Sequence, residues 1–166
     1  MERLDHAARE RILTILRAGQ DLTLATMRPD GYPQATTVSY ASDGLLLYAA
    51  VGLDSQKAHN IQHSPHVSLT VNLPYQDWRH IRGISAAATA TILHGIDELQ
   101  HITAALTHKF PQLRETLPSE TAIPWGSILF LRIAPTVISL LDYSLGFGHT
   151  ELYEIRPEDL PPVAVP

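Results

Sequence analysis

The sequence predicts a mainly β protein, a β-barrel with flanking helices, and three observations support that class. Strand-like runs cover 22–27, 33–40 and 44–51, and the turn-forming stretches RPDG and ASDG separate them. A short helix over 54–63 then leads to HVSLTVNL, in which polar and apolar residues alternate as in a half-buried strand. Strands joined by tight turns, with one helix crossing between the third and the fourth, favour a closed or half-closed antiparallel barrel.

The other elements follow from the same two periodicities. Leu4, Ala8, Ile12 and Ile15 recur at helical spacing and Gly19 is a stop signal, which predicts an opening amphipathic helix. The run LLLYAAV is apolar on both faces, so a helix or a second subunit is expected to cover its outer side. The full set of expected segments is a helix over 2–18, the four strands and the helix already described, a long strand over 81–93, a helix over 95–109, an irregular stretch over 111–125, one long or broken strand over 127–143, a loop with a last short strand over 146–155, and an irregular, loosely held tail from about 156.

Length and composition exclude several classes of function. The 166 residues fit a single domain over 1–166. With 17 acidic and 12 scattered basic residues, the net charge is −5, so we expect neither nucleic acid nor a membrane as partner. The absence of cysteine excludes thiolate catalysis, and the charged opening residues lack the apolar stretch of a signal peptide, so the cytoplasm is the expected location. Only 17% of the residues are charged, which favours an oligomer.

The start of the short helix carries an unusual cation. Asp54 and Ser55 are typical capping residues, and Lys57 follows within the first turn, where the positive pole of the helix disfavours it. An anion bound there would reverse that cost, because the first N–H groups of a helix, a hydroxyl and an ammonium group together form a grip for a phosphate. The alternative is that Asp54 caps the helix while Lys57 pairs with it or extends into water.

The histidines suggest a metal or haem site only weakly. His59 and His63 share one helical face, but no Asp or Glu accompanies them at ligand spacing, so we expect no metal site. The series His94, His101 and His108 opposes the apolar stripe of its helix and should face water. His149 lies among glycines, which let a backbone approach a ligand closely, and it is therefore a candidate site residue.

No catalytic constellation can be recognised in the sequence. The acidic residues fall mainly in turns, termini and surface helices, and no Ser-His-Asp arrangement, Walker A loop or dinucleotide fingerprint is present. The catalytic residues therefore stay unassigned. An active site in such a chain would take its chemistry from a cofactor.

The order of these motifs resembles a known family. Two strands with a DG turn, then LLYAAVGLDSQKAHNIQHSPHVSLTV, then IRGISAAATATIL resemble the pyridoxamine 5'-phosphate oxidase-like family of FMN-binding split-barrel flavoproteins, over about 8–145. The resemblance implies a six- to seven-stranded antiparallel split barrel. It also implies a homodimer with FMN at the subunit interface.

The resemblance assigns roles to individual residues. Ser55 and Lys57, with Gln56 between them, would bind the phosphate of FMN. Residues of the preceding strands would run along the flavin ring, and a third group would reach the cofactor of the other subunit or, with His149, close over the flavin. The cofactor-binding residues that it implies are Ala35, Thr36, Thr37, Val38, Tyr48, Ala49, Ser55, Gln56, Lys57, Trp78, Arg82, Gly83 and His149.

The chain also departs from the family pattern. Many relatives have Arg where this chain has Gln56, and a basic stretch resembling RRNPR where it has QHSPH. Phosphate binding would then be weaker, or Arg79 or Arg82 would compensate. The Arg-x-His motif that true pyridoxamine 5'-phosphate oxidases use for their substrate is absent, and DYSLGFGHTELYEI stands in its place. That substrate is therefore not expected.

The resulting hypothesis is an FMN-dependent oxidoreductase that transfers hydride or electrons to or from an unidentified small molecule. Two alternatives stay open. One is a deazaflavin-dependent reductase, which shares the barrel. The other is a flavin- or haem-binding carrier or sensor without turnover, for which His59, His63 and His149 are the features that favour haem.

Overall fold

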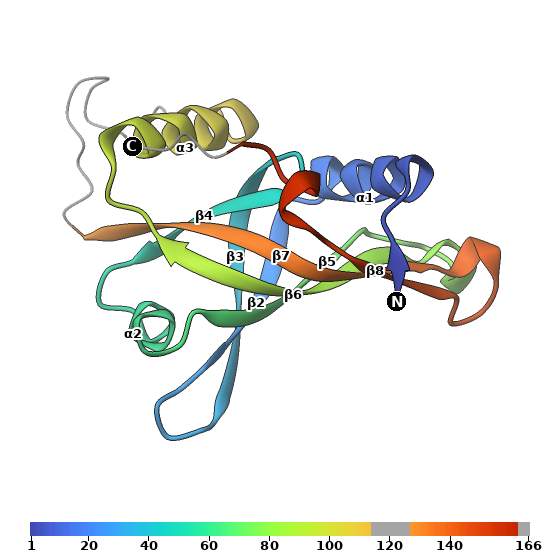
Figure 1. The fold of residues 1–166 in the computed structure, drawn as a ribbon, viewed down its shortest axis with the longest axis horizontal. Helices are drawn as coiled ribbons and strands as arrows, with labels where there is room; N and C mark the ends of the chain where they lie inside the picture. The colour runs from blue at the N-terminus through green and yellow to red at the C-terminus, as the bar shows by residue number, and fades with distance from the viewer. Residues whose placement is uncertain (114–126, 163–166) are drawn as a thin grey trace.

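The computed structural model describes residues 1–113 and 127–162 (Figure 1). The predicted irregular stretch over 111–125 falls mostly outside these residues. The strands are β1 (Glu2–Arg3), β2 (Asp21–Met27), β3 (Pro33–Asp43), β4 (Leu46–Gly52), β5 (His66–Asn72), β6 (Arg82–Ile92), β7 (Ile128–Asp142) and β8 (Thr150–Glu154). The helices are α1 (His6–Ala18), α2 (Gln56–His63) and α3 (Ile96–Lys109), with 3-10 turns η1 (Trp78–His80), η2 (Tyr143–Leu145) and η3 (Pro157–Asp159).

Six strands close into an antiparallel barrel. The order is β4-β3-β2-β5-β6, and β7 pairs with both β4 and β6 to complete the ring. β8 extends β7 outside the ring, and β1 pairs with β8 in parallel. The predicted split-barrel fold is confirmed, including the long strand β7. The two-residue strand β1 was not predicted, because the helical pattern was extended to residue 2, whereas Asp5 caps α1 through its side chain.

Buried and exposed residues alternate along the strands, so every second side chain points into the barrel. Leu22 and Leu24 of β2 are buried while Asp21 and Thr23 are exposed, as expected for a strand with one solvated face. β5 repeats the pattern, and α1 adds Ile12 and Leu16 to the same core. The barrel interior is therefore filled by side chains from strands far apart in the sequence.

A second core lies outside the barrel. Leu46, Tyr48 and Phe130 point outward from β4 and β7, and Ile102 and Leu106 of α3 cover them. This packing answers the question raised by the run LLLYAAV: a helix of the same chain covers the outer face of β4.

Tyr40 joins three elements at one end of the barrel. Its hydroxyl donates a 2.8 Å hydrogen bond to the carbonyl of Leu16 in the last turn of α1, and the Lys109 ammonium group lies 3.8 Å from its ring centroid. Gly19 allows this close approach, since a Cβ there would lie 2.5 Å from Val71 Cγ1 and 2.7 Å from the Tyr40 hydroxyl. Burial raises the pKa of Tyr40, so its hydroxyl stays a donor.

An ion-pair network fixes the C-terminal strand to α1. Arg11 contacts Glu151 at 2.7 Å and Asp142 at 3.5 Å, and the Tyr153 hydroxyl donates to Glu151 at 2.8 Å. His149 pairs with the same carboxylate at 2.8 Å. The hydrogen bond with His149, followed by those from Tyr153 and Arg11, holds the pKa of Glu151 below its ordinary value of 4.5.

The described part of the tail packs more firmly than its composition suggested. Arg156 and Asp159 bracket η3 with reciprocal hydrogen bonds, and Leu160 is partly buried against both cores. A side chain of α1 also reaches it, because Arg9 donates to the carbonyl of Asp159 at 2.8 Å.

Replacing Tyr40 with Phe should lower the free energy of unfolding by about 1 to 2 kcal/mol, because the Leu16 carbonyl loses its short hydrogen bond and keeps only the 3.5 Å one from Lys109. Urea denaturation measures the change. Tyr32→Phe is the matched control, since Tyr32 is 72% exposed and should show no loss. Equal stability of the two variants would contradict the role given to Tyr40.

Replacing Glu151 with Gln should flatten the acid dependence of stability. A carboxylate with a lowered folded-state pKa stabilises the fold above its ordinary pKa of 4.5, and the contribution is lost as the pH falls through the lower folded value. Between pH 6 and pH 3, the wild type should therefore lose more unfolding free energy than Glu151→Gln. Glu10→Gln, at an exposed position of α1, should keep the wild-type slope, and a matching slope in Glu151→Gln would rule out this contribution.

Candidate functional site

The strand β3 changes partner halfway along its length. Residues 33–39 pair with β2, whereas residues 40–43 pair with β4. Beyond Ala49, β4 pairs with β7 alone. Along 35–38, which we call the free edge of β3, half of the backbone N–H and C=O groups therefore point to a side where the described residues supply no partner strand.

A buried amide fixes α2 beside this edge. Asn60 is fully buried, and its Nδ2 donates to Thr26 Oγ1 at 2.9 Å and to Gln34 Oε1 at 3.1 Å. Gln56 Nε2 donates to the Asn60 side-chain oxygen at 2.9 Å. These bonds connect the first and second turns of α2 with β2 and β3, so the N-terminus of α2 has a fixed position next to the free edge.

The α2 N-terminus presents unpaired donors. Ser55, not Asp54, is the N-cap, and its Oγ accepts from the Ala58 N–H at 3.3 Å. The N–H groups of Gln56 and Lys57 have no intrahelical acceptor at these positions. Within the described part of the chain, Lys57 is half-buried and has no carboxylate within 4 Å, so the alternative pairing with Asp54 is not found.

Thr36 adds a polar atom without a partner. Its Oγ1 is buried and makes no hydrogen bond to any described residue. Thr36 lies on the free edge of β3, opposite Leu24 of β2. A buried hydroxyl without a partner costs free energy, and a ligand group at this place would remove that cost.

Three residues predicted to contact a cofactor have inaccessible side chains. Tyr48 is 6% exposed beneath α3, with the His101 ring 5.7 Å away in an edge-on contact, and burial raises its pKa. Ala49 is fully buried in the barrel core, and Val38 of β3 also points inward. The sequence pattern placed Tyr48 and Ala49 in a strand, as the structure does, but could not show that α3 covers Tyr48.

The remaining predicted residues lie at the opposite end of the barrel. Trp78 belongs to η1, which follows the far end of β5, and this strand of seven residues is roughly 20 Å long. Arg82 and Gly83 begin β6 at the same end, where Arg82 is opposite Asp142, and His149 precedes β8. A single chain therefore does not bring these residues together with Ser55 and Lys57.

The expected compensation by a nearby arginine is also not found within one chain. Arg79 belongs to η1 as well, and its guanidinium pairs with Asp77 at 2.6 Å. Neither Arg79 nor Arg82 can reach α2 of its own chain across the length of β5. Their role toward another subunit stays a prediction.

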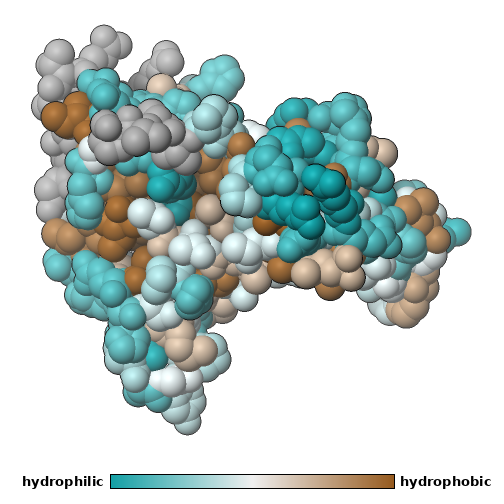
Figure 2. All heavy atoms as spheres, in the orientation of Figure 1, coloured by the Kyte–Doolittle hydropathy of each residue, from teal (hydrophilic) through white to brown (hydrophobic). Residues whose placement is uncertain are grey.

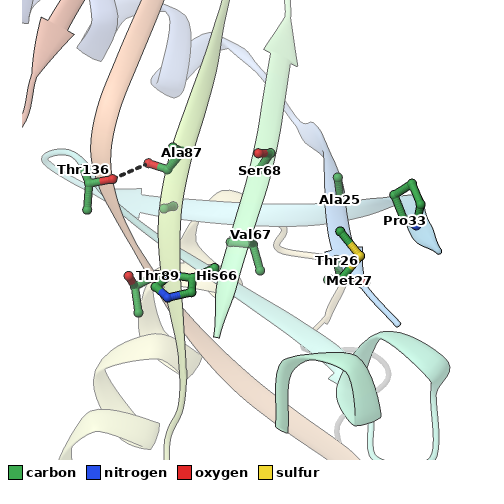
Figure 3. Close-up of a pocket in the computed structure, with 11 residues that line it drawn as sticks. Ala25, Thr26, Met27, Pro33, His66, Val67, Ser68, Ala87, Thr89 and Thr136 are labelled. Atoms are coloured by element: carbon green, nitrogen blue, oxygen red, sulfur yellow. Dashed lines mark hydrogen bonds between the residues drawn. The ribbon is translucent and has the colours of Figure 1, made fainter. Parts of the chain in front are cut away.

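A shallow depression of about 440 Å³ lies along the first half of β5 and the parts of β2 and β6 that pair with it, nearer to α2 than to η1 (Figure 3). Figure 2 shows mainly pale, weakly polar atoms across the middle of the molecule. Sequence reasoning missed this surface, although the outward positions of the alternating strands are small and uncharged. The lining residues are Ala25, Thr26, Met27, Pro33, His66, Val67, Ser68, Ala87, Ala88, Thr89 and Thr136.

Within residues 1–113 and 127–162, no three His, Asp or Glu side chains gather as a metal site. His59 and His63 are exposed on α2. Among the described helices, none has the length and apolar character needed to cross a membrane.

Solved structures share this fold. A haem-binding protein from Mycobacterium smegmatis is similar with a TM-score of 0.73 and 20% identity, over 93% of this chain and 60% of that one. A haem storage protein from Vibrio cholerae has a TM-score of 0.64 and 17% identity, over 81% and 91% of the two chains. A proposed pyridoxamine 5'-phosphate oxidase from Listeria innocua has a TM-score of 0.63 and 22% identity, over 81% and 98%.

Sequence comparison gives the family. No curated protein sequence matches the chain. The sequence model described as pyridoxamine 5'-phosphate oxidase matches residues 8–138, which include the whole of the barrel up to the middle of β7. The chain therefore belongs to the pyridoxamine 5'-phosphate oxidase family of split-barrel proteins.

Proposed function

We propose that the chain binds FMN and acts as a flavin-dependent oxidoreductase on a small molecule. The observation that carries this proposal is the start of α2 beside the free edge of β3, with a half-buried lysine that has no carboxylate partner among the described residues and two N–H groups without an intrahelical acceptor. The bound flavin would supply hydride or electron transfer. The chain itself would supply binding, orientation and exclusion of water.

The α2 N-terminus fits the phosphate of FMN. Lys57 would give a charge-assisted hydrogen bond, and the N–H groups of Gln56 and Lys57 would point at the same anion. The Ser55 hydroxyl already accepts from Ala58, so its own proton is free to be donated to a phosphate oxygen. Gln56 contributes no charge, so the Lys57 ammonium group is the one cation of this phosphate-binding site.

The free edge of β3 fits the flavin ring. Its backbone N–H and C=O groups match the alternating acceptors and donors on the polar rim of an isoalloxazine. The unpartnered Thr36 hydroxyl lies on the same stretch and offers one further hydrogen bond. Binding of the ring through backbone groups accounts for a sequence that has no conspicuous catalytic side chain.

A homodimer would complete the site. Around residues 25–27, 66–68 and 87–89, the outer face of β2, β5 and β6 has no Asp, Glu, Lys or Arg, and depletion of charge is typical of the core of a subunit interface. Because Trp78, Arg82, Gly83 and His149 lie roughly 20 Å from α2 in their own chain, only a second copy could present them to the same cofactor. The cytoplasmic location expected from the sequence stays a prediction.

A haem-binding carrier is the second candidate. It is supported by the fold shared with a haem-binding and a haem storage protein, and by the exposed His59 and His63 on one face of α2. Titration with haem distinguishes the candidates, since histidine ligation produces a sharp Soret band that the variant lacking both histidines would not show.

Replacing Lys57 with Ala should weaken FMN binding by about 1.5 to 3 kcal/mol, or roughly 10- to 150-fold in Kd, because the phosphate loses its cation. Quenching of flavin fluorescence measures the affinity. Binding of riboflavin, which has no phosphate, should not change, and Arg17→Ala at an exposed position of α1 is the charge-matched control. Unchanged FMN affinity would remove Lys57 from the site, and tighter binding of a deazaflavin would favour that cofactor.

Replacing Ser68 with Arg should convert a dimer into monomers, because it places an unpaired charge at the centre of the proposed interface. Analytical ultracentrifugation measures the assembly. Gln100→Arg on the exposed surface of α3 is the control and should stay dimeric. A Ser68→Arg variant that stays dimeric, or a monomeric wild type, would exclude this interface.

A further inference from the structure

Three aromatic rings gather on the surface at the η1 and η2 end of the barrel. We call Trp78, Tyr143 and Phe147 the aromatic cluster. The Phe147 ring centroid lies 6.4 Å from that of Trp78 and 5.3 Å from that of Tyr143. Phe147 is nevertheless 83% exposed and Trp78 67% exposed. Figure 2 shows apolar atoms at this right-hand end, over the orange η2 turn of Figure 1.

Backbone hydrogen bonds hold these rings outward. The N–H of Tyr143 donates to Ile81 O at 3.0 Å, which joins the two segments that carry the rings. Within the loop, the N–H of Gly146 donates to Tyr143 O at 3.2 Å and the N–H of His149 donates to Gly146 O at 3.0 Å. The φ angles of +143° at Gly146 and +74° at Gly148 explain why glycine is needed there. The loop conformation therefore does not depend on burying Phe147.

Among the described residues at this end, one cation has no carboxylate in direct contact. Asp142 and Glu151 are both engaged by Arg11, and Glu151 also pairs with His149. Arg82 lies opposite Asp142 in the register of β6 and β7, where its charge helps to lower the pKa of that carboxyl, but in the described part of the chain no carboxylate lies within 4 Å of its guanidinium. An anionic ligand would complement this charge.

We propose that the aromatic cluster and Arg82 bind a planar aromatic anion, with its ring stacked on Phe147 and Trp78 and its acidic group directed to Arg82. The two exposed rings present roughly 300 Å², whereas a stable protein interface needs about 800 Å² from each partner. The patch therefore fits a small ring better than a protein. As a substrate site it rests on the proposed function, which would place the flavin of a second copy nearby.

Isothermal titration calorimetry with 2-naphthoate tests the proposal. The wild type should bind 2-naphthoate, and cyclohexanecarboxylate should bind at least about tenfold more weakly, because it cannot stack. Phe147→Leu keeps apolar bulk without the flat ring and should weaken 2-naphthoate several-fold. Tyr32→Leu removes another exposed ring and should have no effect. Arg82→Gln should weaken 2-naphthoate but leave neutral 2-naphthol unchanged.

Four results would overturn the proposal. Two of them concern the probes: no binding of 2-naphthoate, or equal binding of both carboxylates. The other two concern Phe147→Leu: an effect on binding equal to that of Tyr32→Leu, or a shift from dimer to monomer, which would make the cluster a subunit contact. Lys57→Ala should leave 2-naphthoate binding intact, and a loss there would place the probe at α2 instead. A separate FMN titration of the same preparation tests the proposed function, so the two failures are distinguishable.

Discussion

The change of partner by β3 is the constraint on which the other features depend. A strand in a closed barrel normally pairs with a neighbour along both edges. Each part of β3 instead pairs along one edge only: residues 33–39 pair with β2, and residues 40–43 pair with β4. The barrel still closes, because β7 is long enough to pair with β4 and β6. The result is a closed barrel in which no strand of residues 1–113 or 127–162 pairs with the outer edge of 35–38.

The position of α2 gives this free edge its chemical character. The connection from β4 places the start of the helix beside the edge, and the buried Asn60 fixes it there through Thr26 and Gln34. A short helix with a lysine in its first turn would be disfavoured alone. Beside an edge that we propose to bind the ring of a cofactor, the same lysine would lie near the phosphate. Structure and electrostatics thus favour the same ligand.

The sequence predicted the barrel well because its signals are local. Alternation in 66–73, the DG turn before β4 and the helical spacing in α1 and α3 each depend on a few neighbouring residues. The burial of Tyr48 could not be predicted, since it depends on a helix some fifty positions later that packs across β4. The aromatic cluster was missed for the same reason: Trp78 and Phe147 meet only because β6 and β7 bring η1 and η2 together.

The central claim is that the N-terminus of α2 holds the phosphate of FMN. Two-dimensional ¹⁵N–¹H NMR of the intact protein, titrated with FMN and separately with riboflavin, tests it most directly. The account predicts that the amide resonances of Gln56, Lys57 and Ala58 shift with FMN and not with riboflavin, while those of residues 35–38 shift with both. Equal shifts of the α2 amides with both ligands, or no shift there with FMN, would contradict it.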